Sequence, residues 1–242
     1  MLYNLIMYNF KLLVNKGKYG MFHMQRDLSL FQKCEKGDSL STTICIYSWD
    51  PPCISFGYSQ KEEKEIDIKK AKSLGWDIVK RPTGGGIVFH NTAEVSYSII
   101  TSIDNPILPK GLIPSYKKIS SAVVFALNQI GLNAEIRNWK LEIGNWKLKT
   151  NNNLCFSYPT EYEIVVGNKK IVGSAQKRGR KALLQQGSIF VRKSDETVFS
   201  VLKNPYKRYN AISVNEILGR EVSFEELRDA LFLGFQERLG II

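Results

Sequence analysis

The sequence predicts one mixed α and β domain built on a central sheet. Short β-branched and aromatic segments, typical of strands, recur along the chain between segments with the apolar spacing of helices. No internal repeat and no low-complexity linker divides the 242 residues, a length that suits one large domain or two small ones. The hydrophobic fraction is 43%, which is ordinary for a globular protein with a sizeable core. This mixture of strands and separated helices favours helices packed on a single sheet.

The first half of the chain contains the clearest strand signals. The segment TTICIYSW (42–49) is β-branched and aromatic, and Pro51 and Pro52 end it. Residues 61–74 are typical of an exposed helix, with Gly75 as a stop signal just past its end. The other expected elements are a first strand in the apolar stretch 1–14, a weakly patterned helix over 21–33, an extended piece over 54–60, and strands over 77–81, 87–90 and 95–101.

The second half adds two amphipathic helices. Apolar spacing predicts a helix over 116–130 that Gly131 stops, and Ser223-Phe-Glu-Glu226 is a capping box that opens a last helix to about residue 239. Gly167-Asn168 predicts a hairpin turn. The expected strands cover 162–166, 170–175 and 187–191, and the pattern within 135–149 predicts an extended, twisted segment.

The location of the protein follows from its hydropathy pattern. No window of about twenty apolar residues lacks charges, so we expect no membrane span. The apolar N-terminal stretch lacks the basic leading segment and the small-residue cleavage site of a secretory signal. We therefore expect a cytoplasmic protein.

The cysteines and histidines do not form a metal-binding pattern. Cys34, Cys45, Cys53 and Cys155 show no C-x-x-C spacing, and only two histidines are available to join them. Four thiols also make a poor disulfide framework for a chain of this size. We expect four reduced thiols, most of them in the core or on strands, and no bound metal.

The charge of the chain is strongly positive. Lys and Arg number 34 against 23 Asp and Glu, which gives a net charge of +11 and a pI of about 9.4. This excess suits nucleic-acid phosphates, an acidic protein partner steered by the long-range field, or a solvated lysine-rich surface with no partner. The basic residues are scattered except in the run KKIVGSAQKRGRK (169–181), so charge leaves the three interpretations open.

The first candidate site segment is RPTGGGIVFH (81–90). Three consecutive glycines cost conformational entropy in an ordinary turn, but they suit a backbone that must approach a ligand closely and donate its amide hydrogens. No Gly-Lys-Ser/Thr follows, and the spacing and following helix of a dinucleotide fingerprint are absent. A tight bend or a bulge in a sheet explains the triplet equally well.

The second and third segments each offer one reactive side chain. Cys155 lies between the polar run TNNN (150–153) and Pro159, so we expect it in a loop before a strand, where nucleophilic thiols are found. Lys170 begins a strand, IVGSAQ, whose small residues leave space into which the lysine is able to point, stabilising a thiolate and polarising a carbonyl. The structural alternatives are an apolar filler for the cysteine and an exposed hairpin residue for the lysine.

Together these segments resemble the lipoate–protein ligase and octanoyltransferase family, which shares its catalytic domain with the biotin protein ligases. The motifs that carry this resemblance are RPTGGGIVFHN (81–91), KKIVGSAQKR (169–178) and LLQQGSIFV (183–191). The chain looks most like the cysteine-dependent octanoyltransferases of the LipM type, in the motifs WDPPCISFGYSQ (49–60), CFSYPTEYEIVV (155–166) and SVNEILGREVSFEEL (213–227). The resemblance extends from about Lys11 to the C-terminus. Relatives of this type often carry Gly-Gly-Arg at 84–86, whereas the triple glycine found here is more typical of the ATP-using ligases.

The resemblance implies a fold and a set of site residues. The fold is similar to the class II aminoacyl-tRNA synthetase and biotin protein ligase core, with a single catalytic domain over 1–242 and its core at about 38–225. Cys155 matches the acyl-accepting cysteine of the family, and Lys170 matches its active-site lysine. His90 is a candidate base by residue type only, and a structural histidine beside the glycine turn is an equal alternative. The residues that we expect around the acyl group on this resemblance are Arg81, Thr83, Gly84, Gly85, Gly86, His90, Gly173, Ser174, Ala175 and Gly187.

The resemblance also implies a reaction. An octanoyl group passes from octanoyl-acyl carrier protein to the Cys155 thiolate and then to a lysine of a lipoyl-domain protein, such as the glycine cleavage H protein. The donor thioester supplies the driving force, so no cofactor and no ATP are expected. Three alternatives remain: an ATP-dependent lipoate ligase in which Lys170 contacts lipoyl-adenylate and Cys155 is idle, a transferase between two lipoyl domains, and a nucleic-acid-binding module supported by charge alone. The last lacks any zinc-finger, RRM or KH signature, and we expect neither nucleic acid nor membrane as a partner.

Overall fold

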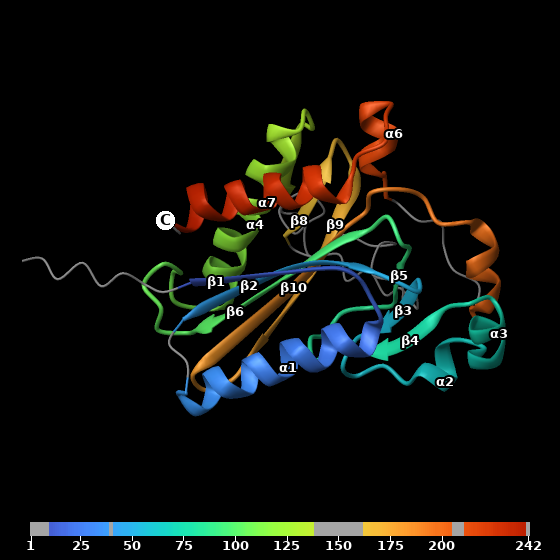
Figure 1. The fold of residues 1–242 in the computed structure, drawn as a ribbon, viewed down its shortest axis with the longest axis horizontal. Helices are drawn as coiled ribbons and strands as arrows, with labels where there is room; N and C mark the ends of the chain where they lie inside the picture. The colour runs from blue at the N-terminus through green and yellow to red at the C-terminus, as the bar shows by residue number, and fades with distance from the viewer. Residues whose placement is uncertain (1–9, 39–40, 138–161, 205–210, 241–242) are drawn as a thin grey trace, which may run out of the picture.

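The computed structural model describes residues 10–38, 41–137, 162–204 and 211–240. They form the predicted mixed α and β fold, in which helices cover both faces of a seven-stranded sheet and a three-stranded sheet lies at one end (Figure 1). Within these residues, no helix is both long enough and apolar enough to cross a bilayer.

The large sheet has the strand order β1-β2-β6-β10-β9-β8-β7. Its first pair, β1 with β2, is parallel, and every other neighbouring pair is antiparallel. The strands are β1 (Phe10–Lys18), β2 (Thr42–Trp49), β6 (Val95–Ser102), β7 (Ala134–Arg137), β8 (Glu163–Val166), β9 (Lys169–Arg178) and β10 (Ala182–Ile189).

Both faces of the large sheet are covered because its central strands are apolar on both sides. Figure 1 shows α4 (Leu112–Gln129) and α7 (Phe224–Leu239) on one face of the large sheet and α1 (Gly20–Lys36) on the other. On β2, Ile44 and Ile46 pack into the core with α4 and α7, whereas Cys45 and Tyr47 pack into the core with α1. This alternation is the period of two that an extended strand imposes on its side chains. A strand buried on both faces loses the alternation of polar and apolar residues, which explains the continuous run TTICIYSW.

The small sheet positions the start of α1. Its order is β4-β3-β5, formed by β4 (Asp77–Lys80), β3 (Cys53–Phe56) and β5 (Val88–His90). The amide of Gly20 donates to Asp77 Oδ2 at 2.9 Å, and a Cβ at residue 20 would lie 2.7 Å from Cys53 Sγ. Only glycine therefore allows α1 to begin this close to the small sheet. The other face of the small sheet packs on the short helices α3 (Ile68–Ser73) and η1 (Glu196–Val201), and α2 (Glu62–Glu65) precedes α3 in the chain.

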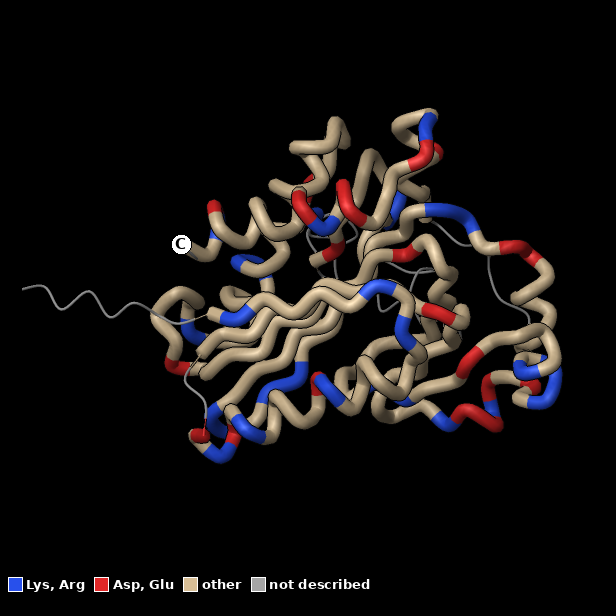
Figure 2. The backbone as a smooth tube through the Cα atoms, in the orientation of Figure 1, with Lys and Arg blue, Asp and Glu red and all other residues tan. Residues whose placement is uncertain are grey.

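The far end of α1 meets the β9–β10 hairpin. The Glu35 carboxylate accepts hydrogen bonds from the backbone amides of Arg180, Lys181 and Ala182 at 2.6, 3.0 and 2.9 Å. Figure 2 shows Lys and Arg gathered around this junction. We call the set the basic end; its members are Lys33, Lys36, Lys177, Arg180 and Lys181.

Several predicted elements differ from those observed. The helix expected over 61–74 is two short helices, because Ile66 leaves the helix, becomes fully buried and pairs with Leu202, and Asp67 then caps α3. The helix α4 begins at Leu112 instead of 116, and β10 covers 182–189 instead of 187–191. Of the extended segment predicted over 135–149, only the part in β7 lies within the described residues.

The capping box was predicted on the wrong helix. Ser223 does accept from the Glu226 amide, but the Glu226 carboxylate pairs with Arg220, so only half of the expected box forms. The complete box opens α6 (Val214–Leu218), where Ser213 and Glu216 satisfy each other's backbone amides. The same Ser-x-x-Glu spacing occurs at both sites. Because Arg220 pairs with the carboxylate of Glu226, only the carboxylate of Glu216 caps its own helix.

Candidate active site

A cavity of about 370 Å³, counted with the open space at its mouth, lies on the α1 side of the large sheet, where β2, β6, β9 and β10 meet the small sheet. Its exposed wall is mostly apolar, which suits an apolar ligand group. The residues lining the cavity are Met24, Tyr47, Trp49, Arg81, Thr83, Val88, His90, Ser96, Gly173, Ser174, Ala175, Gln186, Gly187 and Ser188.

Most of the residues predicted to surround an acyl group meet at this one cavity. They come from three separate parts of the chain, and the pairing of β9 with β10 brings two of these parts together, with Gly187 opposite Ser174. The predicted residues in the lining are Arg81, Thr83, His90, Gly173, Ser174, Ala175 and Gly187. Their contact with a substrate stays a prediction.

The glycine triplet lies behind the cavity and is held by Arg81. The Arg81 guanidinium donates to the carbonyl oxygens of Gly84 and Gly86 at 3.1 and 2.7 Å. Gly85 has a φ of +92°, and its carbonyl oxygen packs so closely on Gly57 that a Cβ there would collide with it. The glycines therefore allow a tight fold of the backbone around a buried cation. The triplet itself does not contribute to the lining formed by the described residues.

The hydroxyl groups around the cavity bind one another. Thr83 donates to the Gln186 side-chain oxygen at 2.8 Å, and the Ser96 and Ser188 hydroxyls are 2.9 Å apart. On the other face of the sheet, the Ser174 hydroxyl lies 2.9 Å from the Tyr97 hydroxyl. Because these groups satisfy one another, the wall presents mainly methylene, methyl and ring carbon to a ligand, despite the many polar residues in the sequence.

A second chain of polar contacts ties the cavity to α1. Gln186, whose side-chain oxygen accepts from Thr83, donates from its nitrogen to Asp27 Oδ2 at 2.8 Å. Asp27 is fully buried and also accepts from Arg26 and Ser98. Each buried polar atom named here has a partner, so the network fixes where α1 sits against the sheet.

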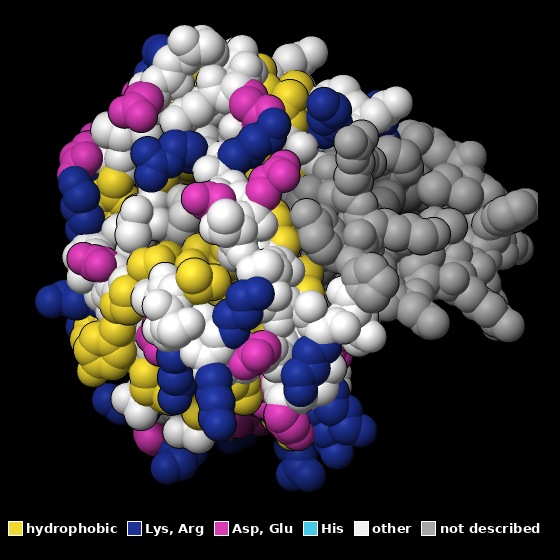
Figure 3. All heavy atoms as spheres, turned by 90° about the vertical axis from the view of Figure 1, so that its right-hand side faces the viewer, with side chains coloured by type: hydrophobic (Ala, Val, Ile, Leu, Met, Phe, Trp, Pro, Cys, Tyr) yellow, Lys and Arg dark blue, Asp and Glu magenta, His cyan; other side chains and the backbone are white. Residues whose placement is uncertain are grey.

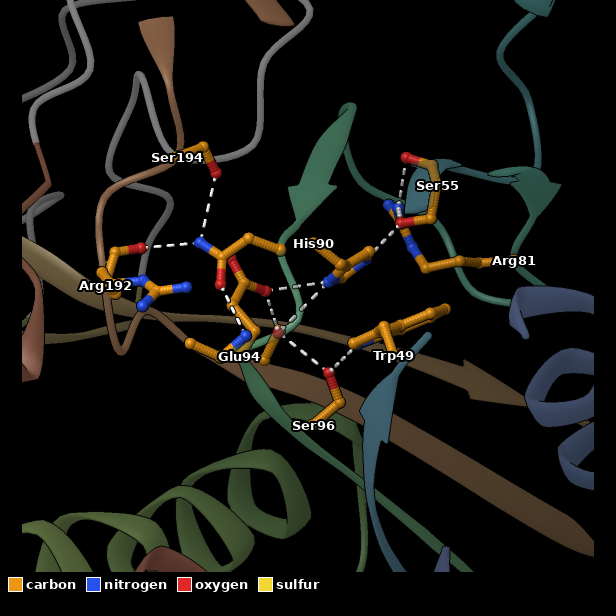
Figure 4. A network of polar contacts seen from close by, with 11 residues as sticks. Trp49, Ser55, Arg81, His90, Glu94, Ser96, Arg192 and Ser194 are labelled. Atoms are coloured by element: carbon orange, nitrogen blue, oxygen red, sulfur yellow. Dashed lines mark hydrogen bonds and ion pairs between the residues drawn. The ribbon is translucent and has the colours of Figure 1, made fainter. Parts of the chain in front are cut away.

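His90 is the centre of a buried network (Figure 4). Its Nε2 lies 2.6 Å from the Ser55 hydroxyl, and its Nδ1 lies 2.9 Å from Glu94 Oε2. Its ring stacks on Trp49 with centroids 4.1 Å apart. Arg81 donates to the Ser55 hydroxyl oxygen at 2.6 Å, so the Ser55 hydroxyl uses its own proton to donate to His90 Nε2. Because Nε2 then accepts, the ring proton of His90 is assigned to Nδ1, which faces Glu94.

Burial favours the uncharged forms of His90 and Glu94. Burial, followed by the charge of Arg81, holds the pKa of His90 well below its usual range. Burial also raises the pKa of Glu94 to about 8, against the opposing effect of the hydrogen bond from Ser188. Glu94 Oε1 has no hydrogen-bond partner among the described residues. Both ring nitrogens of His90 are engaged and its basicity is low, so the geometry favours the structural role over that of a general base.

Lys170 is buried next to a carboxylate. It lies near the start of β9 with 3% of its side chain exposed, and its Nζ is 2.9 Å from Oε1 of Glu163 on β8, which is equally buried. It is not among the described residues that line the cavity, although we expected it to point into the space beside IVGSAQ. Cys155, the predicted nucleophile, lies outside the described residues. The other three cysteines are buried, as expected, and burial raises the pKa of each thiol.

Sequence reasoning missed about half of the cavity wall. Met24 comes from α1, Tyr47 and Trp49 come from β2, and their apolar character gave them the pattern of ordinary core residues. Glu163 was also missed, although CFSYPTEYEIVV carries it within an otherwise apolar strand. No group of three or more His, Cys, Asp or Glu in the described part of the chain is arranged to hold a metal ion.

Comparisons with known proteins agree on one family. The profile of the lipoyl protein ligase A/B catalytic domain matches residues 20–236. The octanoyltransferase LipM of Geobacillus kaustophilus is 36% identical over 91% of this chain and 83% of its own, and that of Clostridioides difficile is 32% identical over 97% and 89%. Among solved structures, a lipoate-protein ligase A bound with ATP has a TM-score of 0.71 at 25% identity, covering 96% of this chain and 85% of its own. A bipartite lipoate protein ligase of Thermoplasma acidophilum has a TM-score of 0.69 at 22% identity, covering 96% and 85%, which shows the fold alone.

Proposed function

The chain belongs to the family of lipoyl protein ligase A/B catalytic domains, and from this premise we propose that it is an octanoyltransferase acting in protein lipoylation. The observation that carries the proposal is the identity of 36% to a LipM octanoyltransferase over 91% of the chain. The apolar wall of the cavity supports it, because a medium-length acyl chain needs an apolar place to bind.

In the proposed reaction, Cys155 is the nucleophile. Its thiolate attacks the carbonyl carbon of an octanoyl thioester on the donor, a new C–S bond forms, and the donor's C–S bond breaks, so the donor sulfur leaves and takes up a proton. The ε-amino group of the acceptor lysine then attacks the Cys155 thioester. A C–N bond forms, the C–S bond to Cys155 breaks, and the proton lost by the amine restores the thiol. The amide is more stable than the thioester, so the two acyl-transfer steps need no ATP and no cofactor.

Lys170 supplies the positive charge that this chemistry needs. An ammonium group near a thiol favours its thiolate form, and near a thioester carbonyl it stabilises the negative charge that develops on oxygen. Lys170 is held in a fixed, buried place, which suits a group that acts on a transition state. Arg81, Thr83 and the small residues of β9 and β10 have the complementary task of enclosing the acyl chain.

The acceptor in this proposal is a lipoyl-domain protein, for which the glycine cleavage H protein is one candidate, and the donor is an octanoyl-acyl carrier protein. We propose that the basic end binds the acidic surface of such a partner by charge complementarity. Lys177 lies two residues along β9 from Ala175, about 7 Å at the rise of a strand, so the basic end begins near the cavity. The face of the molecule shown in Figure 3 instead mixes positive and negative side chains.

One specific observation favours a second candidate, an ATP-dependent lipoate ligase. The fold is shared with a ligase solved with ATP bound, and the triple glycine at 84–86 is the same as in the sequence motif of such ligases. The two activities differ in what they consume. Lipoylation of an acceptor from free lipoate and ATP, without octanoyl-carrier protein, is the result that favours the ligase.

The decisive experiment is the intact mass of the protein after mixing with octanoyl-acyl carrier protein in the absence of ATP. We expect one octanoyl adduct, removed by hydroxylamine and absent in Cys155→Ser. Cys34→Ser is the matched control, because Cys34 is buried at the basic end, and it should form the adduct as the parent protein does. An adduct that survives in Cys155→Ser, or no adduct in the parent protein, would overturn the proposal.

A further inference from the structure

We propose that Glu163 is a positioning residue for the acyl transfer: its carboxylate keeps Lys170 charged and fixes the direction of its ammonium group. The inference rests on the proposed function for the role of Lys170, but it stands on a geometry that is independent of any substrate. No motif assigned a role to Glu163 in advance.

The pair is buried in an apolar part of the sheet. Glu163 Oε1 lies 2.9 Å from Lys170 Nζ, and the exposed fractions of the two side chains are 2% and 3%. The residues that follow each of them on β8 and β9 are fully or almost fully buried aliphatic side chains, which are Ile164, Val165, Ile171 and Val172. The two charged groups therefore face each other in a segment that is otherwise apolar.

The sheet is irregular at this point. The pairing of β8 with β9 changes register between Ile164 and Val165, so that Ile171 is an additional residue on β9. A bulge of this kind bends a strand and changes the direction of nearby side chains. The backbone of Lys170 is also fixed from the other side, because its carbonyl accepts from Ile212 at 3.0 Å. Backbone and side chain of Lys170 are thus both held.

Stability alone is a weak reason for such a pair. Removing two charges from water costs several kcal/mol per ion, and well-packed apolar residues often replace a buried ion pair without loss of stability. A buried charged pair on the strand that also supplies Gly173 to the cavity wall points to a function for the charge itself. The carboxylate supplies that function by favouring the ammonium form of Lys170, which burial alone would disfavour.

The position in the chain connects the pair to the thiol. Glu163 follows Cys155 by eight residues and begins the first described strand after it. A carboxylate at this place acts on the lysine, and the lysine acts on the thiolate and on the developing oxyanion. Glu163 itself carries no acyl group and exchanges no proton in the reaction.

The test compares Glu163→Gln with Glu135→Gln, a matched control on the neighbouring strand whose carboxylate forms an exposed ion pair with Arg137. The first readout is the rate of octanoyl adduct formation, and the second is the pH profile of Cys155 alkylation by iodoacetamide, read at the Cys155 peptide. For E163Q we expect adduct formation about 10–100-fold slower and an alkylation profile displaced to higher pH, as in Lys170→Met. The control E135Q should match the parent protein in both readouts.

Two further variants separate positioning from folding. Glu163→Asp keeps the charge with one methylene fewer, so it should form the octanoyl adduct faster than E163Q does. If E163Q does not fold, Glu163→Asp takes its place in both readouts. In the double variant of E163Q with K170M, the rate should be no lower than in K170M alone, because the carboxylate acts only through the lysine. Equal behaviour of E163Q and E135Q, or multiplicative losses in the double variant, would overturn the proposal.

The alkylation readout keeps the two proposals apart. If the parent protein forms no octanoyl adduct but E163Q and K170M displace the alkylation profile alike, the transferase assignment fails, and what stands is that Glu163 controls the charge and direction of Lys170. If the adduct forms and E163Q leaves both readouts unchanged, the assignment stands and the role of Glu163 fails.

Discussion

Replacing Gly187 with alanine tests how tightly the large sheet is packed on the face behind the cavity, where Tyr97 lies. A Cβ at residue 187 would lie 2.5 Å from the Tyr97 hydroxyl oxygen and closer still to two ring carbons, whereas ordinary contact begins at 3.4 Å. The Tyr97 ring would have to retreat by about 1 Å, but it is fully buried, and its other side packs on Phe235.

The magnitude follows from two effects. Overpacking a core by one methyl group costs about 1–3 kcal/mol, and loss of the hydrogen bond between Tyr97 and Ser174 adds about 1 kcal/mol. We expect G187A to lower the free energy of unfolding by about 2–4 kcal/mol, which corresponds to a fall in Tm of about 5–15 °C for a chain of this length.

The assay is thermal and urea unfolding of G187A beside Gly84→Ala. Gly84 has no positive φ, and no heavy atom lies within 4 Å of a Cβ there, so G84A should change stability by less than about 0.5 kcal/mol. In the double variant of G187A with Tyr97→Leu, the cost should be smaller than the sum of the two single costs, because the smaller side chain relieves the clash. A G187A protein as stable as the parent, or additive costs, would refute the packing argument.

Two further predictions concern charge. Burial raises the pKa of Glu94 to about 8 from its usual value near 4.5, so between these pH values the folded protein keeps a proton that the unfolded chain releases. As the pH rises from about 4.5 to 8, Glu94→Gln should therefore gain stability relative to the parent, measured by urea unfolding at several pH values. A difference in stability that does not change with pH would contradict this. The second prediction follows from the proposal that the basic end binds an acidic donor. The kcat/KM measured with the carrier protein should fall about tenfold as ionic strength rises well above 0.15 M. A variant with Lys33 and Lys36 changed to Gln should lose much of this dependence of kcat/KM on ionic strength. A rate independent of salt would remove the support for this surface.

Local signals in the sequence predicted the elements that depend on local chemistry. The strand over 42–49 was predicted to the residue, because eight β-branched, apolar or aromatic residues followed by two prolines leave little choice. The hairpin at Gly167-Asn168 also forms as expected, with Gly167 at a φ of +59°. The prediction of one continuous helix over 61–74 was wrong because Ile66 leaves the helix and pairs with Leu202, a contact between segments far apart in the sequence.

The motifs named Thr83 and the small residues of β9, which lie in the cavity wall, and the glycine triplet, which does not lie in the wall that the described residues form; their roles stay predictions. The motifs did not reveal that Arg81 would hold the triplet, that Ser96 would meet Ser188 on the neighbouring strand, or that Glu163 would face Lys170 over a bulge. The last two contacts depend on strand pairing, which a single sequence does not fix.

The Glu35 carboxylate gives the basic end an internal counter-ion. Three successive backbone amides at the tip of a hairpin form the kind of concave donor set that captures anions from solution, but here the chain's own side chain already fills it. An incoming acidic protein therefore meets flexible lysine and arginine heads instead of a preformed phosphate cradle. In the docking that we propose, such a surface would favour diffuse negative charge over any particular anion, so that one face would serve both a donor and an acceptor in turn.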